Sequence, residues 1–290
     1  MSGPNPSLEP TLHPAVGRAL HDSGPDTGIV VLTRSEGTLR LGSTHAVVPV
    51  ASVTKLAVAL AVLVAVEDGS LTLDDPAGPP GSSVRHLLCH ASGLSFDDST
   101  VLAEPATRRI YSNTGYDALA VHLTSRTGWP WTDYVTEAVL DPLGMTSSEL
   151  VGPAGSGLRS SADDLALLAS ELLTPTLLTA VTAREMRQPQ FPDLDGVVPG
   201  YGQQRPCPWG LGPELKGTKT PHWTAGGSSP ATFGHFGAAG SFLWVDPDAR
   251  VAAVFVSDRP FGEWARTSWS DLSAALLLAG SGVDPDDGHV

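Results

Sequence analysis

The sequence PVASVTKL, residues 49–56, leads directly into the longest apolar run of the chain, Leu56–Val66. The run has eleven residues between Lys55 and Glu67, whereas a helix that spans a membrane needs about 20 apolar residues. The pattern predicts a helix over residues 53–67 that is apolar nearly all round and is therefore surrounded by other elements. We expect it to be the central helix of the molecule.

Ser52 and Lys55 stand three positions apart at the start of this segment. On a helix, residues with this spacing share a face, so the Lys55 amine can reach the Ser52 hydroxyl. A serine hydroxyl becomes an effective nucleophile when a base removes its proton, and the apolar stretch after Lys55 supplies the desolvation that lowers the pKa of an amine. Taken alone, the pattern also fits a capping serine beside a solvated lysine.

Two further segments carry polar groups suited to the same chemistry. Tyr111-Ser112-Asn113 precedes a predicted helix over residues 116–126. A phenol near a cationic lysine ionises more easily and can act as a base or proton shuttle, and an amide can both donate and accept hydrogen bonds.

His235-Phe236-Gly237 lies in a predicted strand, where a small residue leaves room for a substrate and the next backbone N–H can point at an oxyanion. Each segment alone also fits a purely structural loop or bulge.

Together, and in this order, the three segments resemble the serine β-lactamase-like and penicillin-binding-protein-like superfamily, which includes D,D-peptidases and esterases related to class C β-lactamases. The similarity runs from about residue 28 to about residue 258. It is carried by the segments EDGSLTLDDP (67–76), HLLCHASGL (86–94), DPLGM (141–145), LRSSADDL (158–165), WGLG (209–212) and FGHFGAAGSFLWVDP (233–247). The resemblance implies an α+β protein of β-lactamase-like fold, in which an antiparallel sheet with flanking helices packs against a helical sub-domain.

The resemblance also implies a role for each matching residue. Ser52 would be acylated, with Lys55 and Tyr111 as its activating base pair. The substrate-binding and oxyanion groups would be Asn113, His235, Gly237 and Ala238, with the backbone N–H groups of Ser52 and Ala238 forming the oxyanion hole.

His235 stands where many penicillin-active members have a lysine. A lysine is a fixed cation that can hold a substrate carboxylate, whereas a histidine is largely neutral near pH 7. The resemblance therefore points to an esterase-type serine hydrolase that acts on small esters or amides. D,D-peptidase, D-amino-acid amidase or weak β-lactamase activity is one alternative, and a non-catalytic binding protein on the same scaffold is another.

The order of predicted elements divides the chain into two sub-domains. Residues 11–75 and 190–282 are expected to build the sheet and its flanking helices, and residues 76–189 the helical sub-domain. Strands are predicted over residues 28–34, 38–42, 233–236, 241–245 and 251–257, and helices over 11–21, 85–89, 116–126, 131–139, 162–173 and 269–279. The proline-rich residues 1–10 and the tail 283–290 are expected to be disordered.

Charge and cysteine content limit the partners and the compartment. The net charge of −14, from 31 acids and 17 bases, repels phosphate backbones and anionic lipid, so we expect neither nucleic acid nor a membrane surface as a partner. Cys89 and Cys207 form no disulfide framework and no secretory signal is visible, which predicts reduced thiols in a cytoplasmic protein.

His86 and His90 stand four apart without a third suitable ligand, so we expect no metal. We expect no cofactor, and a small-molecule acyl substrate as the partner; the oligomeric state is left open.

Overall fold

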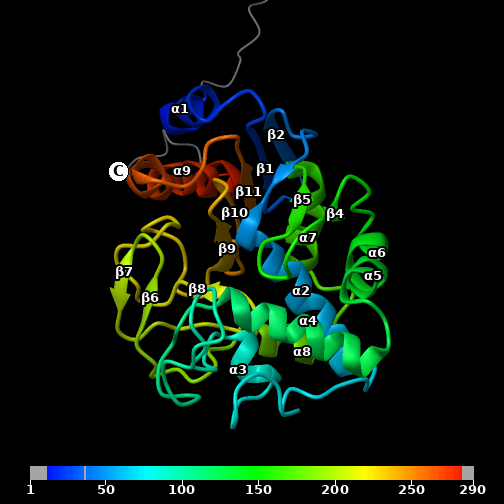
Figure 1. The fold of residues 1–290 in the computed structure, drawn as a ribbon. Helices are drawn as coiled ribbons and strands as arrows, with labels where there is room; N and C mark the ends of the chain where they lie inside the picture. Colours follow the sequence, from blue (N-terminus) through cyan, green and yellow to red (C-terminus); the bar gives the residue numbers. More distant parts are fainter. Residues whose placement is uncertain (1–11, 36, 283–290) are drawn as a thin grey trace, which may run out of the picture.

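A six-stranded antiparallel sheet forms the centre of the molecule (Figure 1). The computed structural model describes residues 12–35 and 37–282, so the predicted disorder of residues 1–10 and 283–290 concerns segments outside the described residues. The strands are β1 (Gly28–Leu32), β2 (Thr38–Gly42), β8 (Glu214–Leu215), β9 (Phe233–Gly237), β10 (Ser241–Asp246) and β11 (Val251–Val256). They follow the order β2-β1-β11-β10-β9-β8. Because β1 pairs with β11, distant parts of the chain build one sheet, as the sequence predicts.

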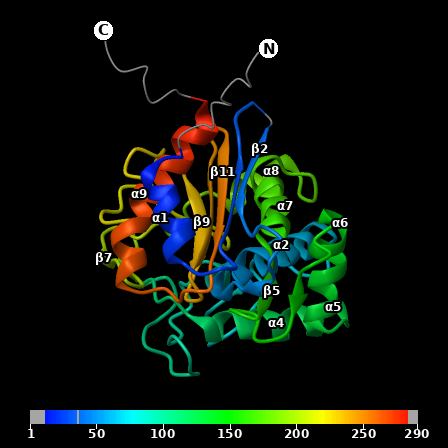
Figure 2. The ribbon, with the colours of Figure 1, turned by 90° about the horizontal axis from the view of Figure 1, so that it is seen from above.

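Helices cover both faces of this sheet (Figure 2). The helices α1 (Pro14–Asp22) and α9 (Glu263–Ser281) lie on one face, while α2 (Thr54–Glu67) and α7 (Ala162–Leu173) lie on the other. Successive side chains of a strand point to opposite faces, so Ile29 joins the core on the α9 side and Val30 joins the core on the α2 side. Both faces are therefore buried, which explains why β1 is apolar throughout. The arrangement is the α+β architecture predicted from the sequence.

The helix α2 passes through the middle of the larger core. Its side chains from Thr54 to Leu63 are all buried, as predicted for a helix that is apolar nearly all round. The α-helix begins at Thr54, because the three residues before it, Ala51–Val53, form a turn of 3-10 helix named η1. The α-helix therefore starts one residue later than the sequence predicts, and Ser52 lies in the 3-10 turn that precedes it. Across residues 12–35 and 37–282, no helix has both the length and the apolar character needed to cross a membrane.

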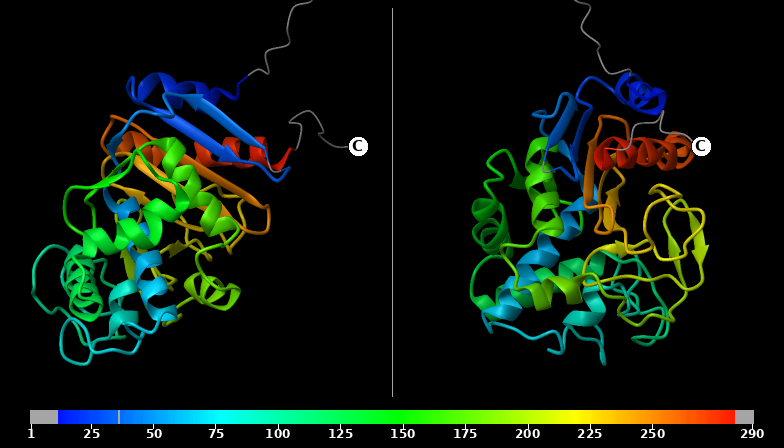
Figure 3. Two further views of the ribbon diagram at one scale, coloured as in Figure 1. Left: turned by 90° about the vertical axis from the view of Figure 1, so that its right-hand side faces the viewer. Right: turned by 180° about the vertical axis from the view of Figure 1, so that it is seen from behind.

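The middle of the chain adds mostly helices, at the far end of the molecule from α1 and α9 (Figure 3). These are α3 (Val84–Leu88), α4 (Asn113–Thr127), α5 (Trp131–Val135), the π-helical turn η2 (Thr136–Leu140), α6 (Asp141–Leu143) and α8 (Ala180–Met186). The sequence did not predict the small sheet of β3 (Val48–Pro49), β4 (Glu149–Leu150) and β5 (Leu158–Ser160), or the hairpin of β6 (Gly196–Val198) and β7 (Gly202–Gln204). Since α7 packs on β1 and β11, the segment 76–189 also supplies a helix to the sheet, and the proposed sub-domain boundaries stay a prediction.

Candidate active site

The turn that carries Ser52 is held in a strained conformation. Ala51 has a φ of 45°, which is unfavourable for a residue with a side chain and persists only where the surroundings impose it. The Thr54 hydroxyl donates to the Ala51 carbonyl at 2.5 Å and accepts from the Leu158 N–H at 3.0 Å. These bonds tie the η1 turn to β5 and fix the half-buried Ser52 at the start of α2.

Lys55 is fully buried directly below Ser52. Its Nζ donates to Asn113 Oδ1 and to the Gly155 carbonyl, both at 2.7 Å, and lies 3.4 Å from Ser52 Oγ. Burial lowers the pKa of the Lys55 amine from 10.5 to about 7, although the charges of Asp117 and Asp97 act in the opposite direction. A neutral amine has two N–H donors and one lone pair. The two short bonds use both donors, so the lone pair is left for the Ser52 hydroxyl proton.

Tyr111 lies beside the same amine. The Lys55 Nζ is 4.8 Å from the centre of the Tyr111 ring. Burial raises the pKa of the Tyr111 phenol above its usual value, and a hydrogen bond with Ser52 offsets only part of this effect. The structure therefore differs from the expectation that a cationic lysine promotes ionisation of the phenol, because burial disfavours the charged form of both groups. The pKa shifts of the two groups favour Lys55 as the base and Tyr111 as a protonated hydrogen-bond donor.

Asn113 is the first residue of α4 and is fixed in orientation. Its Nδ2 donates to Asp97 Oδ1 at 2.8 Å, and its backbone N–H donates to the Phe96 carbonyl at 2.8 Å. A carboxylate accepts hydrogen bonds only, so the Asn113 amide must direct its oxygen toward Lys55. The Ser112 hydroxyl caps α4 by accepting from the Gly115 N–H at 2.9 Å. Together these contacts hold the Tyr111–Asn113 segment against the lysine.

The end of β9 closes the site on the other side of Ser52. A Cβ atom on Gly237 would lie 2.2 Å from the Val50 carbonyl oxygen, so no larger residue fits there without displacement. The Ser241 hydroxyl also donates to that carbonyl at 2.9 Å. These contacts hold Gly237, and the exposed Ala238 that follows it, beside the η1 turn.

His235 is buried on β9 with its ring centre 5.8 Å from that of Tyr111. Its Nδ1 lies 2.7 Å from the Phe236 carbonyl oxygen, a contact in which only a protonated Nδ1 can donate. Burial, together with the charge of Lys55, lowers the pKa of His235 to about 3. His235 is therefore neutral at pH 7, and it brings no positive charge to the site.

Trp209 packs beside Tyr111 and His235. Its ring centre lies 5.9 Å from that of Tyr111 and 5.8 Å from that of His235. The Lys219 Nζ lies 5.3 Å from the same ring centre. Trp209 is buried, so it packs in the interior against these rings.

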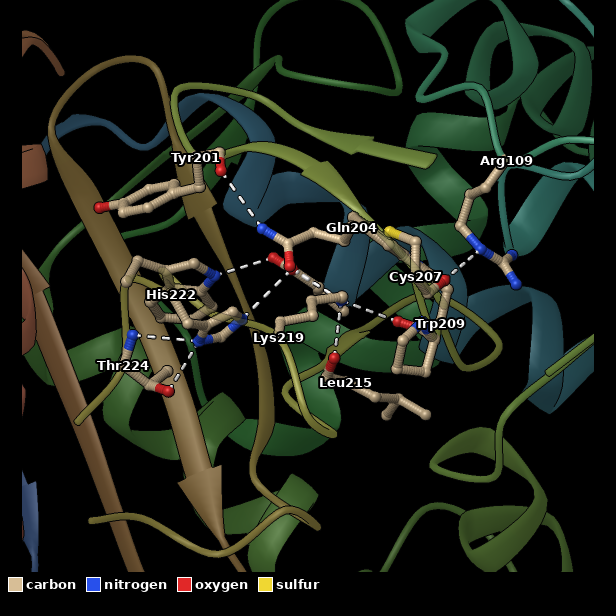
Figure 4. Close-up of polar contacts among 12 residues, drawn as sticks. Arg109, Tyr201, Gln204, Cys207, Trp209, Leu215, Lys219, His222 and Thr224 are labelled. Atoms are coloured by element: carbon tan, nitrogen blue, oxygen red, sulfur yellow. Dashed lines mark hydrogen bonds and ion pairs between the residues drawn. The ribbon is translucent and has the colours of Figure 1, made fainter. Parts of the chain in front are cut away.

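Lys219 belongs to a buried polar network next to Trp209 (Figure 4). Its Nζ donates to Glu214 Oε1 at 2.8 Å, to the Leu215 carbonyl at 2.7 Å and to the Pro208 carbonyl at 2.9 Å. Burial alone would raise the pKa of the Glu214 carboxyl, but the charge of Lys219 brings it well below its usual range. Glu214 therefore stays ionised, and it also accepts from the Trp223 indole N–H at 2.8 Å.

The structure thus gathers the predicted site residues around one place, namely Ser52, Lys55, Tyr111, Asn113, His235, Gly237 and Ala238. Sequence reasoning missed Gly155 and Asp97, which contact Lys55 and Asn113 directly. Gly155 lies in the glycine-rich stretch VGPAGSG, residues 151–157, which is the one signal that could have pointed to it. Cys89 and Cys207 are both free and buried, as expected for reduced thiols. In the part of the chain that the structure describes, no three His, Cys, Asp or Glu side chains group as metal ligands.

Several known proteins are similar to this chain in sequence or in fold. A beta-lactamase from Mycobacterium bovis has 46% sequence identity and a TM-score of 0.88, over 92% of this chain and 99% of that one. The hydrolase EstCE1, described as having promiscuous acyltransferase activity, shares the fold with a TM-score of 0.72 at 19% identity, over 92% of this chain and 97% of its own. The penicillin-binding protein 4* of Bacillus subtilis is 27% identical over 140 residues, which span 37% of this chain but only 31% of that protein.

The profile of the Beta-lactamase family matches residues 38–277, a range that contains every candidate site residue. The chain therefore belongs to the beta-lactamase family, within the superfamily of serine β-lactamases and penicillin-binding proteins.

Proposed function

We propose that the chain is a serine hydrolase that cleaves small uncharged esters through an acyl-enzyme on Ser52. The observation that carries this proposal is the environment of Lys55: its Nζ makes two short hydrogen bonds to protein acceptors, lies 3.4 Å from Ser52 Oγ, and has a pKa lowered by burial to about 7. Such an amine can act as a general base close to neutral pH.

In acylation, Ser52 Oγ attacks the ester carbonyl carbon while Lys55 Nζ takes the Oγ proton. The carbonyl oxygen becomes an oxyanion, which the backbone N–H groups of Ser52 and Ala238 would stabilise. When the tetrahedral intermediate collapses, the bond to the leaving alkoxide breaks and Tyr111 donates its proton to that oxygen. The Lys55 ammonium then restores the phenol, so the enzyme is left with an acyl group on Ser52 and a neutral amine.

In deacylation, a water molecule attacks the acyl carbon and Lys55 takes its proton. The bond between Oγ and the acyl carbon breaks, the proton returns to Oγ, and the carboxylic acid leaves. If an alcohol attacks in place of water, the product is a new ester. EstCE1 is described as combining hydrolysis with acyl transfer on this fold, which supports acyl transfer as a side reaction here.

The preference for uncharged substrates rests on the charges around the site. The chain has three lysines, and Lys55 and Lys219 are both buried among acceptors of the protein. The third, Lys216, donates to three backbone carbonyls and to a serine hydroxyl. His235 is neutral at pH 7. A substrate carboxylate therefore meets no lysine here, which disfavours β-lactams and D-Ala-D-Ala peptides.

The second candidate function is β-lactam hydrolysis, favoured by the 46% identity to a structure described as a beta-lactamase. Initial rates on p-nitrophenyl butyrate, a chromogenic cephalosporin and a D-Ala-D-Ala peptide separate the two. We expect the highest kcat/KM on the ester. A cephalosporin turned over as efficiently as the ester would contradict the ester preference.

The nucleophile is tested by labelling with a fluorophosphonate and mapping the adduct by peptide mass spectrometry. We expect the adduct on Ser52, and we expect Ser52→Ala to lose ester hydrolysis by about three orders of magnitude or more. Ser125→Ala, which removes an exposed hydroxyl on α4, is the control and should leave both readouts unchanged. An unlabelled Ser52, together with full activity in Ser52→Ala, would refute the mechanism.

A further inference from the structure

His90 is a buried histidine that the proposed reaction does not use. It follows α3 and is 1% exposed. Burial, reinforced by the positive charge of Lys55, holds the pKa of His90 well below its usual value, so the ring is neutral. The sequence singled it out only as half of a possible zinc pair with His86, and the structure gives the two rings different neighbours, because His86 stacks on Phe191.

Three contacts connect His90 to three consecutive residues around Tyr111. The His90 carbonyl accepts from the Ile110 N–H at 2.9 Å. The ring packs on the Tyr111 ring with 4.4 Å between centres. The Nδ1 atom accepts from the Ser112 N–H at 3.2 Å. One residue therefore holds both the backbone and the ring of the Tyr111 segment.

The tautomer of His90 follows from the last contact. A backbone N–H can only donate, so Nδ1 must be the acceptor and the ring proton must sit on Nε2. That Nε2 is buried and has no hydrogen-bond partner among the described residues. The ring therefore makes its polar contact through Nδ1 and packs its face against Tyr111.

The backbone of His90 is also unusual. Its φ is 58°, in the left-handed region that residues other than glycine adopt uncommonly. This conformation sends the His90 carbonyl to Ile110 while the side chain reaches Ser112. Backbone strain of this kind is maintained where the surrounding contacts require it.

We propose that His90 is a positioning residue that holds Tyr111 at the distance from Ser52 and Lys55 that proton transfer requires. The inference rests on the proposed function, since it concerns the phenol that donates to the leaving group. His90 does not touch the reacting atoms and acts through Tyr111 alone. The alternative is that His90 only fills space in the cluster formed by Trp209, Tyr111 and His90.

Three substitutions separate positioning from packing. His90→Asn keeps an acceptor in place of Nδ1, and asparagine tolerates a positive φ. His90→Gly relieves the backbone but removes the acceptor, and His90→Ala removes the acceptor and keeps the strain. All three substitutions remove the ring. If His90 only fills space, His90→Asn and His90→Gly should therefore lower kcat/KM by similar factors. On ethyl butyrate, whose alkoxide leaving group must take a proton, we expect His90→Asn to keep kcat/KM within about 5-fold of wild type, and His90→Gly to lose roughly 100-fold.

The Tyr111→Phe background supplies the sharper test. Without the phenol there is no proton for His90 to position, so His90→Gly should cost less than about 2-fold in that background. His86→Asn is the matched control and should leave the activity unchanged. Equal losses in His90→Asn and His90→Gly, or an undiminished loss in the Tyr111→Phe background, would overturn the proposal.

Amide hydrogen exchange of the peptide that covers residues 110–113 decides the proposal independently of catalysis. We expect protection of this peptide in wild type and His90→Asn, and faster exchange in His90→Gly, because the Ser112 N–H has lost its acceptor. Equal protection in Asn and Gly would refute the positioning role even if the protein hydrolysed no ester. An inactive wild type whose Ser52 takes no label refutes the proposed function instead, so the two failures are distinguishable.

Discussion

Lys55 sets the pH dependence of the proposed reaction, because only the neutral amine can take a proton from Ser52. Burial lowers its pKa to about 7, so the reactive fraction falls about tenfold for each pH unit below that value. We expect kcat/KM on p-nitrophenyl butyrate to rise with pH through an apparent pKa near 7 and then to level off. The rate of fluorophosphonate labelling at Ser52 should follow the same curve. A profile that stays flat from about pH 5.5 to about pH 9 would remove Lys55 from the role of base.

Gly155 sets the space around that amine. A Cβ atom there would lie 3.1 Å from Asn113 Oδ1 and 3.2 Å from Lys55 Nζ, so one of these atoms must move by a few tenths of an ångström. Since catalytic rates depend steeply on such distances, we expect Gly155→Ala to lower kcat/KM roughly 10-fold. Its melting temperature should change little.

Gly227→Ala is the matched control for Gly155→Ala, because a Cβ on Gly227 meets nothing within 4 Å. Both variants are measured by ester hydrolysis and by thermal unfolding. Full activity in Gly155→Ala would show that the lysine tolerates the displacement. A fall in melting temperature that matches the loss of activity would show that folding is affected as well.

Among the helices and strands, local sequence patterns predicted the longer elements with a clear period, and they missed the short strands that form only through contacts with distant parts of the chain. The bounds of β2 and α7 agree with their prediction, and the Ser161 hydroxyl caps α7 by accepting from the Asp164 N–H at 3.1 Å. The strands β4 and β5 have too few residues to show a period. The helix α9 begins at Glu263 instead of residue 269, since the apolar spacing that marks it is clear only from Trp269 onward.

The same distinction explains which site residues the sequence could identify. Ser52 and Lys55 are close because of helical spacing, which is visible in four letters of sequence. The Lys55 contacts with Asn113 and Gly155 join residues 58 and 100 positions apart. Only the packing of α4 and of the loop before β5 against α2 creates them. The low pKa of Lys55, by contrast, was predictable, because the apolar run after it guarantees burial.

The central helix α2 should dominate the stability of the larger core. Leu63 is fully buried in it, so Leu63→Ala removes apolar surface and leaves a cavity. We expect a loss of about 2–5 kcal/mol in the free energy of unfolding, measured by urea denaturation. Leu167→Ala on α7, where the side chain is 40% exposed, is the control and should cost less than about 1 kcal/mol. Equal losses would contradict the central position of α2.

At the scale of the whole molecule, β9 connects the buried polar network to the reaction site. Glu214 pairs with Gly234 in the register of β8 and β9, one residue before His235. Through Lys219, whose Nζ lies 5.3 Å from the centre of the Trp209 ring, the same carboxylate is linked to a residue that packs beside Tyr111. A change in this network should therefore reach both the stability of the fold and the geometry of the site, although no member of the network touches Ser52.

The buried pair of Lys219 and Glu214 gives the last prediction. Lys219→Met leaves the Glu214 carboxylate buried without its cation, so we expect a loss of about 3–5 kcal/mol in the free energy of unfolding. Combining it with Glu214→Gln removes the uncompensated charge and should recover part of that loss, with a coupling free energy on the order of 1–3 kcal/mol by urea denaturation. The exposed pair of Arg205 and Asp195 lies at a similar distance, 3.1 Å, and Arg205→Met should cost less than about 1 kcal/mol because solvent screens it. If Lys219→Met costs no more than Arg205→Met, Glu214 must take up a proton or meet water when its partner is lost, and the prediction that the buried pair is the more costly one to break is wrong.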